Sequence, residues 1–402
     1  KLFPFVIKMK VHPLLLLIGL TYAIGQDRQI ISKLNPGCDH CDYTKNPLIY
    51  IRAEGYNDTV HQLWDFTNHL PAMVYAIGSP NSTLTVLWNE DQPNKFMFSE
   101  QPMLYSFAAT IDSIIEYNDL KDNGHYDTNC KKKVWSLDHL SWRLADSVLT
   151  DKEAMVKLHG EEDRKTGVLE MKLDLLPFRD YAIDLPHLVH TANSTLVDIR
   201  VVNHTTHHGF NSSRFALHFV LISTDPSTDT WSMAMRKSLD DEHTPDVFEI
   251  IEIKSPETSR SGNGGFMQFR PVAYTEPERG VSSSTNAYIS SFNRTNVPSS
   301  SILRNFYKGY FQDRKQEVVV QDMVISFGLA GDGFYRQHNF TSWSFTLGYG
   351  MPPLEGFSLF VIIIITIGMG VPVILALSGI LYVVVRRCKQ RNPPARFTND
   401  ES

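Results

Sequence analysis

The chain contains 402 residues, of which 42% are hydrophobic, and its formal net charge at pH 7 is −6. Its two ends are basic: without residues 1–25 and 357–402, the region 26–356 has 30 basic and 42 acidic residues, a net charge of −12. An acidic surface without basic clusters argues against nucleic acid as a partner and would suit an acidic compartment. The middle region is longer than a usual single core, so one large domain or two packed domains are expected.

Residues 1–25 have the pattern of a secretory signal peptide. Lysines precede a short apolar run at 14–20, and small residues follow at Ala23 and Gly25. A charged start, a short apolar stretch and a small-residue cleavage site define such a peptide. The run is too short to span a bilayer. Because Met9 lies within this segment, translation is expected to start there.

A second apolar segment lies near the other end. Residues 357–385 contain no charged side chain, and basic residues follow at once. About 20 apolar residues suffice for a transmembrane helix, and positive charge marks its cytoplasmic side. The sequence therefore predicts a single-pass type I membrane protein with most of its chain in the lumen and a cytoplasmic tail at 386–402. Cys388, beside the span, is a candidate palmitoylation site.

The luminal region has the residue pattern that is typical of a β protein. Short segments rich in β-branched and aromatic residues alternate with Asn, Asp, Gly, Pro and Ser clusters. We therefore predict a mainly β fold, an antiparallel β-sandwich, with one C-terminal transmembrane helix. One short luminal helix is expected within 301–311. The predicted strands are 48–52, 83–88, 95–98, 168–175, 195–201, 215–222, 247–253, 266–269, 317–325 and 343–347.

A boundary inside the luminal region is expected near 180–190. Pro177 and Pro186 bracket a turn-rich stretch there. This position divides the region into a first β-rich half, 26–185, and a second β-rich half, 186–356.

Asn-x-Ser/Thr sequons are frequent in the luminal region. Chance would give roughly three in a region of this composition, and a used sequon marks exposed chain in a secreted protein. The excess predicts a glycosylated surface. The seven sites are Asn57, Asn81, Asn193, Asn203, Asn211, Asn293 and Asn339.

Cysteine is scarce in the luminal region. Cys38, Cys41 and Cys130 permit one internal disulfide and leave one thiol over. The C-x-x-C spacing of the first two is also found at redox and zinc sites. It lies outside any βαβ context, however, which favours a structural bridge from one member of the pair to Cys130.

The search for catalytic motifs gives no nucleophile elbow, metalloprotease helix, Walker loop or calcium loop. His204, His207 and His208 form a dense imidazole cluster, but they overlap a sequon and are expected on an exposed loop. The carboxylates and histidine at 240–243 are neighbours that an extended chain would point to opposite faces. The glycine-rich stretch 261–265 precedes a predicted strand and is expected to be a flexible turn. We predict no enzyme, no cofactor and no metal site.

Several segments are similar to a known family. Residues 238–248 (SLDDEHTPDVF) and 265–274 (GFMQFRPVAY) resemble the signature region of the glycosylated lysosomal membrane protein family. Residues 48–55 (LIYIRAEG) and 348–353 (GYGMPP) are similar to it as well. The resemblance covers nearly the whole luminal part and the predicted topology.

The resemblance implies a non-enzymatic accessory subunit in the lysosomal membrane. Its partner would be a transporter like major facilitator superfamily domain-containing protein 1, which exports dipeptides. The glycosylated luminal domain would shield the transporter from lysosomal proteases. Vertebrate members of the family end in a tyrosine-based sorting signal, which the tail at 386–402 lacks, so lysosomal delivery is expected to depend on the partner. Luminal cysteines are also fewer here, so the disulfide pattern of those members does not transfer.

No sequon lies between Asn211 and Asn293, which makes this window the expected place of partner contact. Phe266, Met267, Arg270 and Tyr274 are the predicted contact residues, because aromatic, Met and Arg side chains dominate interface energies. Two other interpretations of the chain remain open. One is a luminal hydrolase built on residues 240–243, and the other is a cell-surface receptor or adhesion module.

Overall fold

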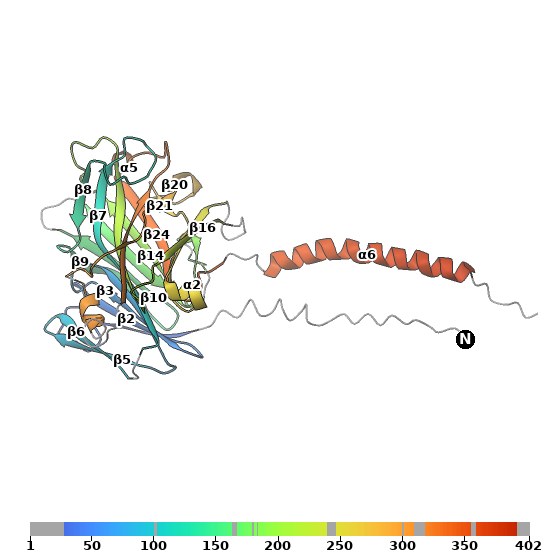
Figure 1. Ribbon diagram of the computed structural model, residues 1–402, viewed down its shortest axis with the longest axis horizontal. Helices are drawn as coiled ribbons and strands as arrows, with labels where there is room; N and C mark the ends of the chain where they lie inside the picture. The colour runs from blue at the N-terminus through green and yellow to red at the C-terminus, as the bar shows by residue number, and fades with distance from the viewer. Residues whose placement is uncertain are drawn as a thin grey trace, which may run out of the picture.

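The folded region consists of two large antiparallel sheets that face each other, and a separate apolar helix follows it (Figure 1). The computed structural model describes residues 28–99, 103–162, 167–178, 181–182, 184–238, 247–299, 301–308, 318–354 and 359–391. The predicted signal peptide and most of the predicted tail lie outside these ranges.

The first sheet has ten strands and is built around two long neighbours, β7 and β15. Its main path runs β1 (Gln29–Leu34), β2 (Leu48–Glu54), β3 (Thr59–Asp65), β4 (Ala72–Gly78), β7 (Tyr105–Asn118), β15 (Ser213–Pro226), β23 (Val318–Phe327), β21 (Ala287–Ile289). Off this path, β8 (Lys132–Ser136) pairs with β7, and β22 (Asn293–Arg294) pairs with β23.

The second sheet also has ten strands, with β24 and β14 near its centre. Its main path runs β16 (Ser232–Lys237), β17 (Glu249–Lys254), β18 (Gly265–Phe269), β24 (Phe340–Tyr349), β14 (Ser194–Val202), β11 (Val168–Leu175), β10 (Ala154–Glu161), β9 (Ser141–Leu149). Off this path, β19 (Ala273–Tyr274) pairs with β24 and with β20 (Ser284–Thr285).

Smaller elements surround the two sheets. Two hairpins, two strands each, pair β5 (Leu84–Asn89) with β6 (Gln92–Phe98) and β12 (Tyr181–Ala182) with β13 (Leu185–Val189). The short helices in the described part of the folded region are α2 (Pro256–Ser261), the 3₁₀ turn η1 (Val281–Ser283), α3 (Leu303–Phe306) and α5 (Tyr335–His338). The helix expected within 301–311 is therefore present as the single turn α3.

The main hydrophobic core lies between the two sheets. On β11, Leu169, Met171 and Leu173 are buried while the residues between them are half-buried, which is the alternation expected of a strand with one face on the core. Across the core, the Phe219 ring of β15 meets the Phe345 ring of β24 at 5.6 Å between centroids. The predicted antiparallel β-sandwich is confirmed.

A second, smaller core covers the outer face of the first sheet. The β5–β6 hairpin and α3 pack there, and the Phe96 and Phe306 rings lie 5.2 Å apart. Because this cover hides the outer face, every residue of β3 and β4 is buried and neither strand shows alternation. The sequence boundary near 185/186 does not separate the sheets, since each contains strands from both sides of it.

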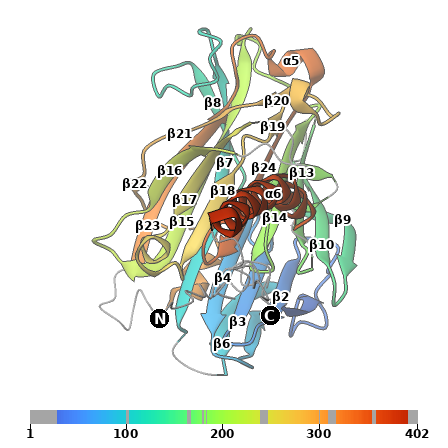
Figure 2. The ribbon, with the colours of Figure 1, turned by 90° about the vertical axis from the view of Figure 1, so that its right-hand side faces the viewer.

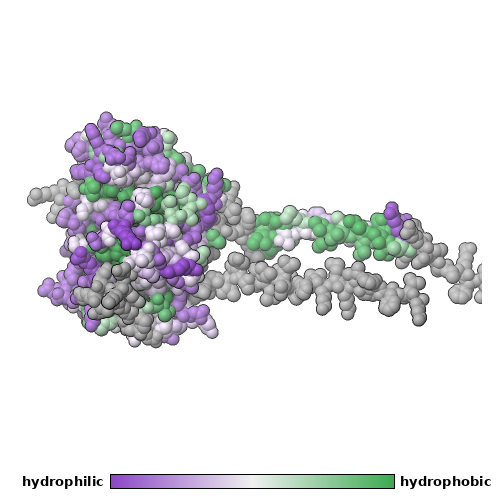
Figure 3. Space-filling model, in the orientation of Figure 1, coloured by the Kyte–Doolittle hydropathy of each residue, from purple (hydrophilic) through white to green (hydrophobic). Residues whose placement is uncertain are grey.

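The C-terminal helix α6 (Leu359–Arg391) is long and apolar enough to cross a membrane. Its segment Val361–Cys388 contains 28 residues, and the most apolar 18-residue stretch of this segment has a mean hydropathy of 2.6 and is not buried against the protein. At 1.5 Å per residue such a segment exceeds the roughly 30 Å of a bilayer core. Figure 3 shows the apolar surface of α6 beside the mixed surface of the folded region.

Several ionisable groups are buried in the sandwich. The Asp65 carboxylate, at the end of β3, accepts hydrogen bonds from the backbone N–H and hydroxyl of Thr67 at 3.2 and 2.6 Å. Burial nevertheless raises the pKa of Asp65 to about 7, because desolvation outweighs these hydrogen bonds. The His61 ring lies 2.8 Å from both the Tyr50 and the Ser82 hydroxyls, and burial lowers the pKa of His61 to about 4.

The shifted pKa values of Asp65 and His61 have opposite effects on the stability of the folded chain as the pH falls. Folded Asp65 holds its proton up to about pH 7, whereas its ordinary pKa is 3.8, so its contribution to stability grows as the pH falls from 7 towards 4. His61 opposes this: its folded pKa is below the ordinary 6.5, so its contribution is lost as the pH falls from 6.5 towards 4.

Replacing Asp65 by Asn isolates the first effect. Between about pH 7.5 and about pH 5, the wild-type chain is expected to gain about 2–3 kcal/mol in the free energy of unfolding relative to Asp65→Asn. Urea unfolding of the two proteins at both pH values measures this difference. Asp146→Asn, which removes an exposed carboxylate, is the control. An equal difference between wild type and Asp65→Asn at both pH values would show that Asp65 is ionised in the folded chain.

Candidate docking site

The four predicted contact residues are not on the surface. The Phe266, Met267 and Tyr274 side chains are fully buried, and Arg270 is 2% exposed. Strand β18 runs between β17 and β24, and all its residues are buried. Arg270 donates to the carbonyl oxygen of His187 at 3.2 Å. The prediction that these four residues form a contact surface is therefore wrong, because all four are buried: Phe266 and Met267 on the central strand β18, Arg270 just after it and Tyr274 on β19.

The exposed part of the same sequon-free window is helix α2 and the turn after it. Ser255 caps the helix by accepting a hydrogen bond from the Thr258 backbone N–H, and Pro256 occupies its first turn. The helix ends at Gly262, whose φ of 78° is the left-handed conformation that favours glycine. Gly264 is buried, and a Cβ there would overlap Ser255 and Thr258. The glycine-rich stretch is a tightly packed turn that leads into β18. The flexible turn expected from the sequence is therefore not found.

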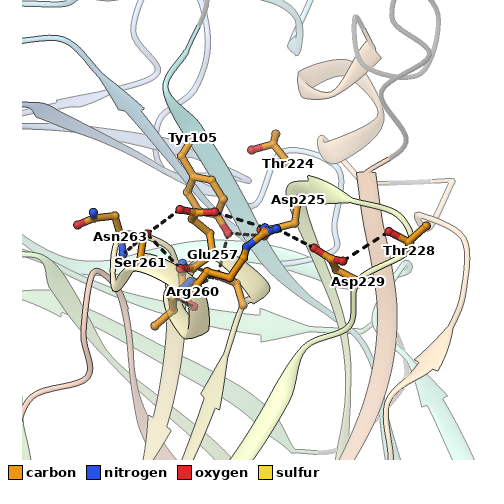
Figure 4. Close-up of polar contacts among 12 residues, drawn as sticks. Tyr105, Thr224, Asp225, Thr228, Asp229, Glu257, Arg260, Ser261 and Asn263 are labelled. Carbon is orange, nitrogen blue, oxygen red and sulfur yellow. Dashed lines mark hydrogen bonds and ion pairs between the residues drawn. The ribbon is translucent and has the colours of Figure 1, made fainter.

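A buried carboxylate ties α2 to the first sheet (Figure 4). Asp225, at the end of β15, accepts hydrogen bonds from the Tyr105 hydroxyl and from Arg260, both at 2.8 Å. The Tyr105 and Ser255 hydroxyl oxygens lie 2.8 Å apart. Burial raises the pKa of the Asp225 carboxyl, whereas hydroxyl donors and Arg260 act against this rise. The helix therefore has a fixed position relative to both sheets.

The solvent-facing side of the contact between Asp225 and Arg260 is polar and half exposed. The side chain of Arg260 is 51% exposed and also lies 3.2 Å from Asp229 and 3.3 Å from Glu257. Figure 4 shows these carboxylates on either side of the guanidinium. We call α2 and residues 262–264, with Asp225 and Asp229, the α2 edge.

The α2 edge lies where the chain leaves for α6. Gly350 donates its backbone N–H to the carbonyl oxygen of Gly264 at 2.8 Å, and a Cβ on Gly262 would touch Met351 at 3.3 Å. Helix α6 begins at Leu359, so a few residues at roughly 3.5 Å each limit the distance from the α2 edge to α6. Figure 1 shows α2 at the side of the domain from which this segment departs. Exposed apolar side chains lie on the segment that leads to α6, at Met351 and Leu354, and beside Tyr105, at Leu104.

The predicted glycosylation sites lie mostly on open surface. Asn57, Asn81, Asn203, Asn211, Asn293 and Asn339 are exposed. Asn193 is half-buried, and its side-chain oxygen accepts a hydrogen bond from Arg28 Nε.

Three of these sequons gather at one end of the sandwich. The backbone N–H of Asn203 donates to the carbonyl of Asn339 at 2.8 Å, and Arg336 of α5 binds the loop at Thr206 and His207, which precedes Asn211. Figures 1 and 2 place α5 at the end of the domain away from β5 and β6.

The other sequence candidates are not brought together. The His204 ring stacks on Trp135 at 4.5 Å, whereas the His207 ring packs on Phe210 at 4.6 Å, so each has its own aromatic neighbour. His208 is exposed. The acidic stretch at 240–243 lies outside the described residues.

The disulfide differs from the predicted one. Cys38 bonds to Cys41, and Cys130 is a free thiol. Cys38 lies in the loop before β2, beside β5, whereas Cys130 lies in the loop before β8. Figure 2 shows β8 and β6 at opposite ends of the sandwich, so a bridge to Cys130 is out of reach. Cys388, the palmitoylation candidate, is exposed on α6.

Comparison with known proteins identifies the family. Residues 47–390 match the family model described as glycosylated lysosomal membrane protein. This chain belongs to the glycosylated lysosomal membrane protein family. It is 28% identical over 405 residues to glycosylated lysosomal membrane protein A of Xenopus laevis, covering 94% of this chain and 96% of the relative. The Danio rerio relative is 29% identical over 354 residues (85% and 84%), and the Homo sapiens relative is 26% identical over 363 residues (85% and 84%).

The family assignment confirms the resemblance found in the sequence. The relatives' names describe membrane proteins of the lysosome, which agrees with the single helix α6 that could span a membrane in the described part of this chain.

Substituting Gly264 tests how the α2 edge is built. Gly264→Ala is expected to destabilise the folded chain by about 1–3 kcal/mol, because the added methyl group would overlap the Thr258 backbone and the Ser255 cap. Gly280→Ala is the matched control, since a Cβ there meets nothing within 4 Å. The two variants are compared by urea unfolding. Equal stability of both variants would mean that the return after α2 is loosely packed.

Proposed function

We propose that this family member is a non-enzymatic accessory subunit of a multi-span transporter in the lysosomal membrane. The partner would be a major-facilitator transporter of dipeptides, as the family resemblance implies. The luminal domain stabilises the transporter and shields it from lysosomal proteases. One observation supports this role above the others: six exposed sequons lie elsewhere on the domain, and none of the residues of the α2 edge belongs to a sequon, although the half-buried Asn193 lies beside Gly350 at its border.

A type I orientation with a luminal domain is part of the proposal. All seven sequons precede α6, and N-linked glycans are added only to luminal chain. Basic residues end α6, as expected on the cytoplasmic side. In this orientation a large, rigid domain stands over the membrane next to any partner of α6.

Shielding requires a luminal domain that is itself resistant to proteolytic cleavage. Strands paired into two ten-stranded sheets present few extended segments to a protease. Glycans at the α5 end would add bulk on the side away from α2.

Docking is proposed at the α2 edge. A glycan takes up space that an interface needs, so sequon-free surface near the membrane is open to a transporter's luminal loops. Arg260 with its three carboxylate neighbours offers charged contacts, and Met351 offers an apolar one. The hydrogen bonds to Asp225 fix α2 and Arg260 in place before a partner binds, which lowers the conformational entropy lost on binding.

The two rival interpretations have direct tests. A hydrolase would show turnover against dipeptide or glycoside substrates at acid pH, and loss of that turnover in Asp241→Asn would contradict the accessory role. A receptor or adhesion module would bind a ligand at the cell surface without a multi-span partner.

Removing the clustered sequons tests shielding. Asn203→Gln, Asn211→Gln and Asn339→Gln combined should shorten the half-life of the partner transporter in lysosomes several-fold, because protease access increases. Asn57→Gln with Asn81→Gln is the control. Enzymatic deglycosylation of the wild-type chain should lower its apparent mass by several glycans. A shift of only one or two glycans, or an unchanged half-life, would contradict shielding.

A single substitution can place a glycan on the α2 edge. Ser259→Asn makes a sequon with Ser261, and both positions are exposed. The glycosylated variant is expected to fold and leave the endoplasmic reticulum, yet to lose at least tenfold in recovery of the co-purified transporter, about 1.4 kcal/mol. Ser259→Asn combined with Ser261→Ala carries the same asparagine without a sequon and should bind normally. An occupied glycan with normal co-purification would place the docking face elsewhere.

A further inference from the structure

The segment between β1 and β2 contains a disulfide within a Cys-Asp-His-Cys sequence. The bridge joins Cys38 and Cys41, three positions apart. Cys38 is 8% exposed, Cys41 is half-buried, and His40 is exposed. Both ring nitrogens of His40 lie 3.6 Å from Cys38 Sγ. A disulfide and an imidazole that can donate a proton therefore share one surface loop.

The loop has its own anchors apart from the bridge. Asn35 exchanges two hydrogen bonds with the backbone of Leu48, both at 2.8 Å. The Trp88 indole N–H donates to the Pro36 carbonyl at 2.8 Å, and Gly37 packs against the backbone of Val86. A bridge across three positions also closes the kind of short loop that gives a disulfide its smallest stabilising effect. Holding the fold together is thus a weak explanation for this bridge.

We propose that Cys38–Cys41 is a redox-active disulfide that exchanges with small thiols of the cysteine or glutathione class. The sulfur of Cys41, the more exposed of the two cysteine residues, receives the attack of the incoming thiolate. A bond forms between these two sulfurs, the Cys38–Cys41 bond breaks, and its electron pair goes to Cys38 Sγ. His40 stabilises the departing thiolate with a ring N–H, and a better leaving thiolate speeds the exchange.

A second thiol completes the exchange. It attacks the sulfur that is bound to Cys41, forms a disulfide with it and releases Cys41 as a thiolate, which takes up a proton. Two small thiols are oxidised to one disulfide, and the bridge is reduced to two thiols. This activity is independent of the proposed accessory role.

Cys130 provides an internal reference. It is half-buried on another loop, and burial raises the pKa of its thiol. A buried, poorly ionised thiol exchanges slowly. Alkylation of Cys130 therefore reports whether the folded chain has opened during an experiment.

The test uses the full chain in detergent micelles. Reduced glutathione is added, free thiols of the folded chain are alkylated in a brief pulse at neutral pH, and the alkylated cysteines are located by peptide mass spectrometry. The bridge is expected to open in the folded chain without any change in Cys130 alkylation. Cys38→Ser, in which Cys41 has lost its partner, should retain a glutathione adduct on Cys41 after exposure to oxidised glutathione.

Variants of His40 separate an exchange site from an accessible structural bridge. His40→Ala should slow opening by about tenfold, His40→Lys should restore much of the rate, and Asp39→Ala should leave it unchanged. The proposal is overturned if the bridge resists glutathione until Cys130 also becomes reactive. It is equally overturned if His40→Ala opens at the wild-type rate.

Discussion

The antiparallel pairing of β7 with β15 is the interaction on which the rest of this structure depends. Each strand has 14 residues, and their register runs from Asn118 opposite Ser213 to Phe107 opposite Ser223. The pairing sets Phe107 and Phe219 into the core between the sheets. At one end it places Tyr105 beside Asp225, which fixes α2. At the other end, Arg214 meets Asp119 at 3.0 Å and Asp332 at 2.7 Å.

The geometry at both ends of the sandwich therefore depends on the pairing of β7 with β15. A slip by one residue would turn every core side chain of β15 to the outside and separate Tyr105 from Asp225. The α2 edge is accordingly part of the central sheet system, although it contains only a short helix and a turn.

The sequence predicted the fold class because several strands face the core on one side only. The alternation in β11 is visible in the sequence and is present in the structure. Strands β3 and β4 were missed because a second core covers the outer face of their sheet, so no alternation remains. The buried strand β18 was mistaken for a contact surface because its aromatic and Met side chains, which the sequon-free window contains, are common both in interfaces and in cores. Strand order could not be predicted, since β7 pairs with a strand about a hundred residues later.

The candidate docking site was only partly predictable. The sequon-free window and its glycine-rich turn were visible in the sequence, but the tie between Asp225 and Arg260 joins residues 35 positions apart. No local pattern signals such a contact. The family, by contrast, was recognisable from the segments at 238–248 and 265–274. A continuous run of residues can be compared directly between sequences, whereas contacts between distant residues cannot be read from one sequence.

Affinity purification of the full chain from lysosomal membranes tests the central claim most directly. The account predicts that one multi-span major-facilitator transporter co-purifies in near-equal amount and is recovered at a similar level after mild crosslinking. Recovery of the chain alone, or with soluble luminal proteins and no multi-span partner, would contradict it.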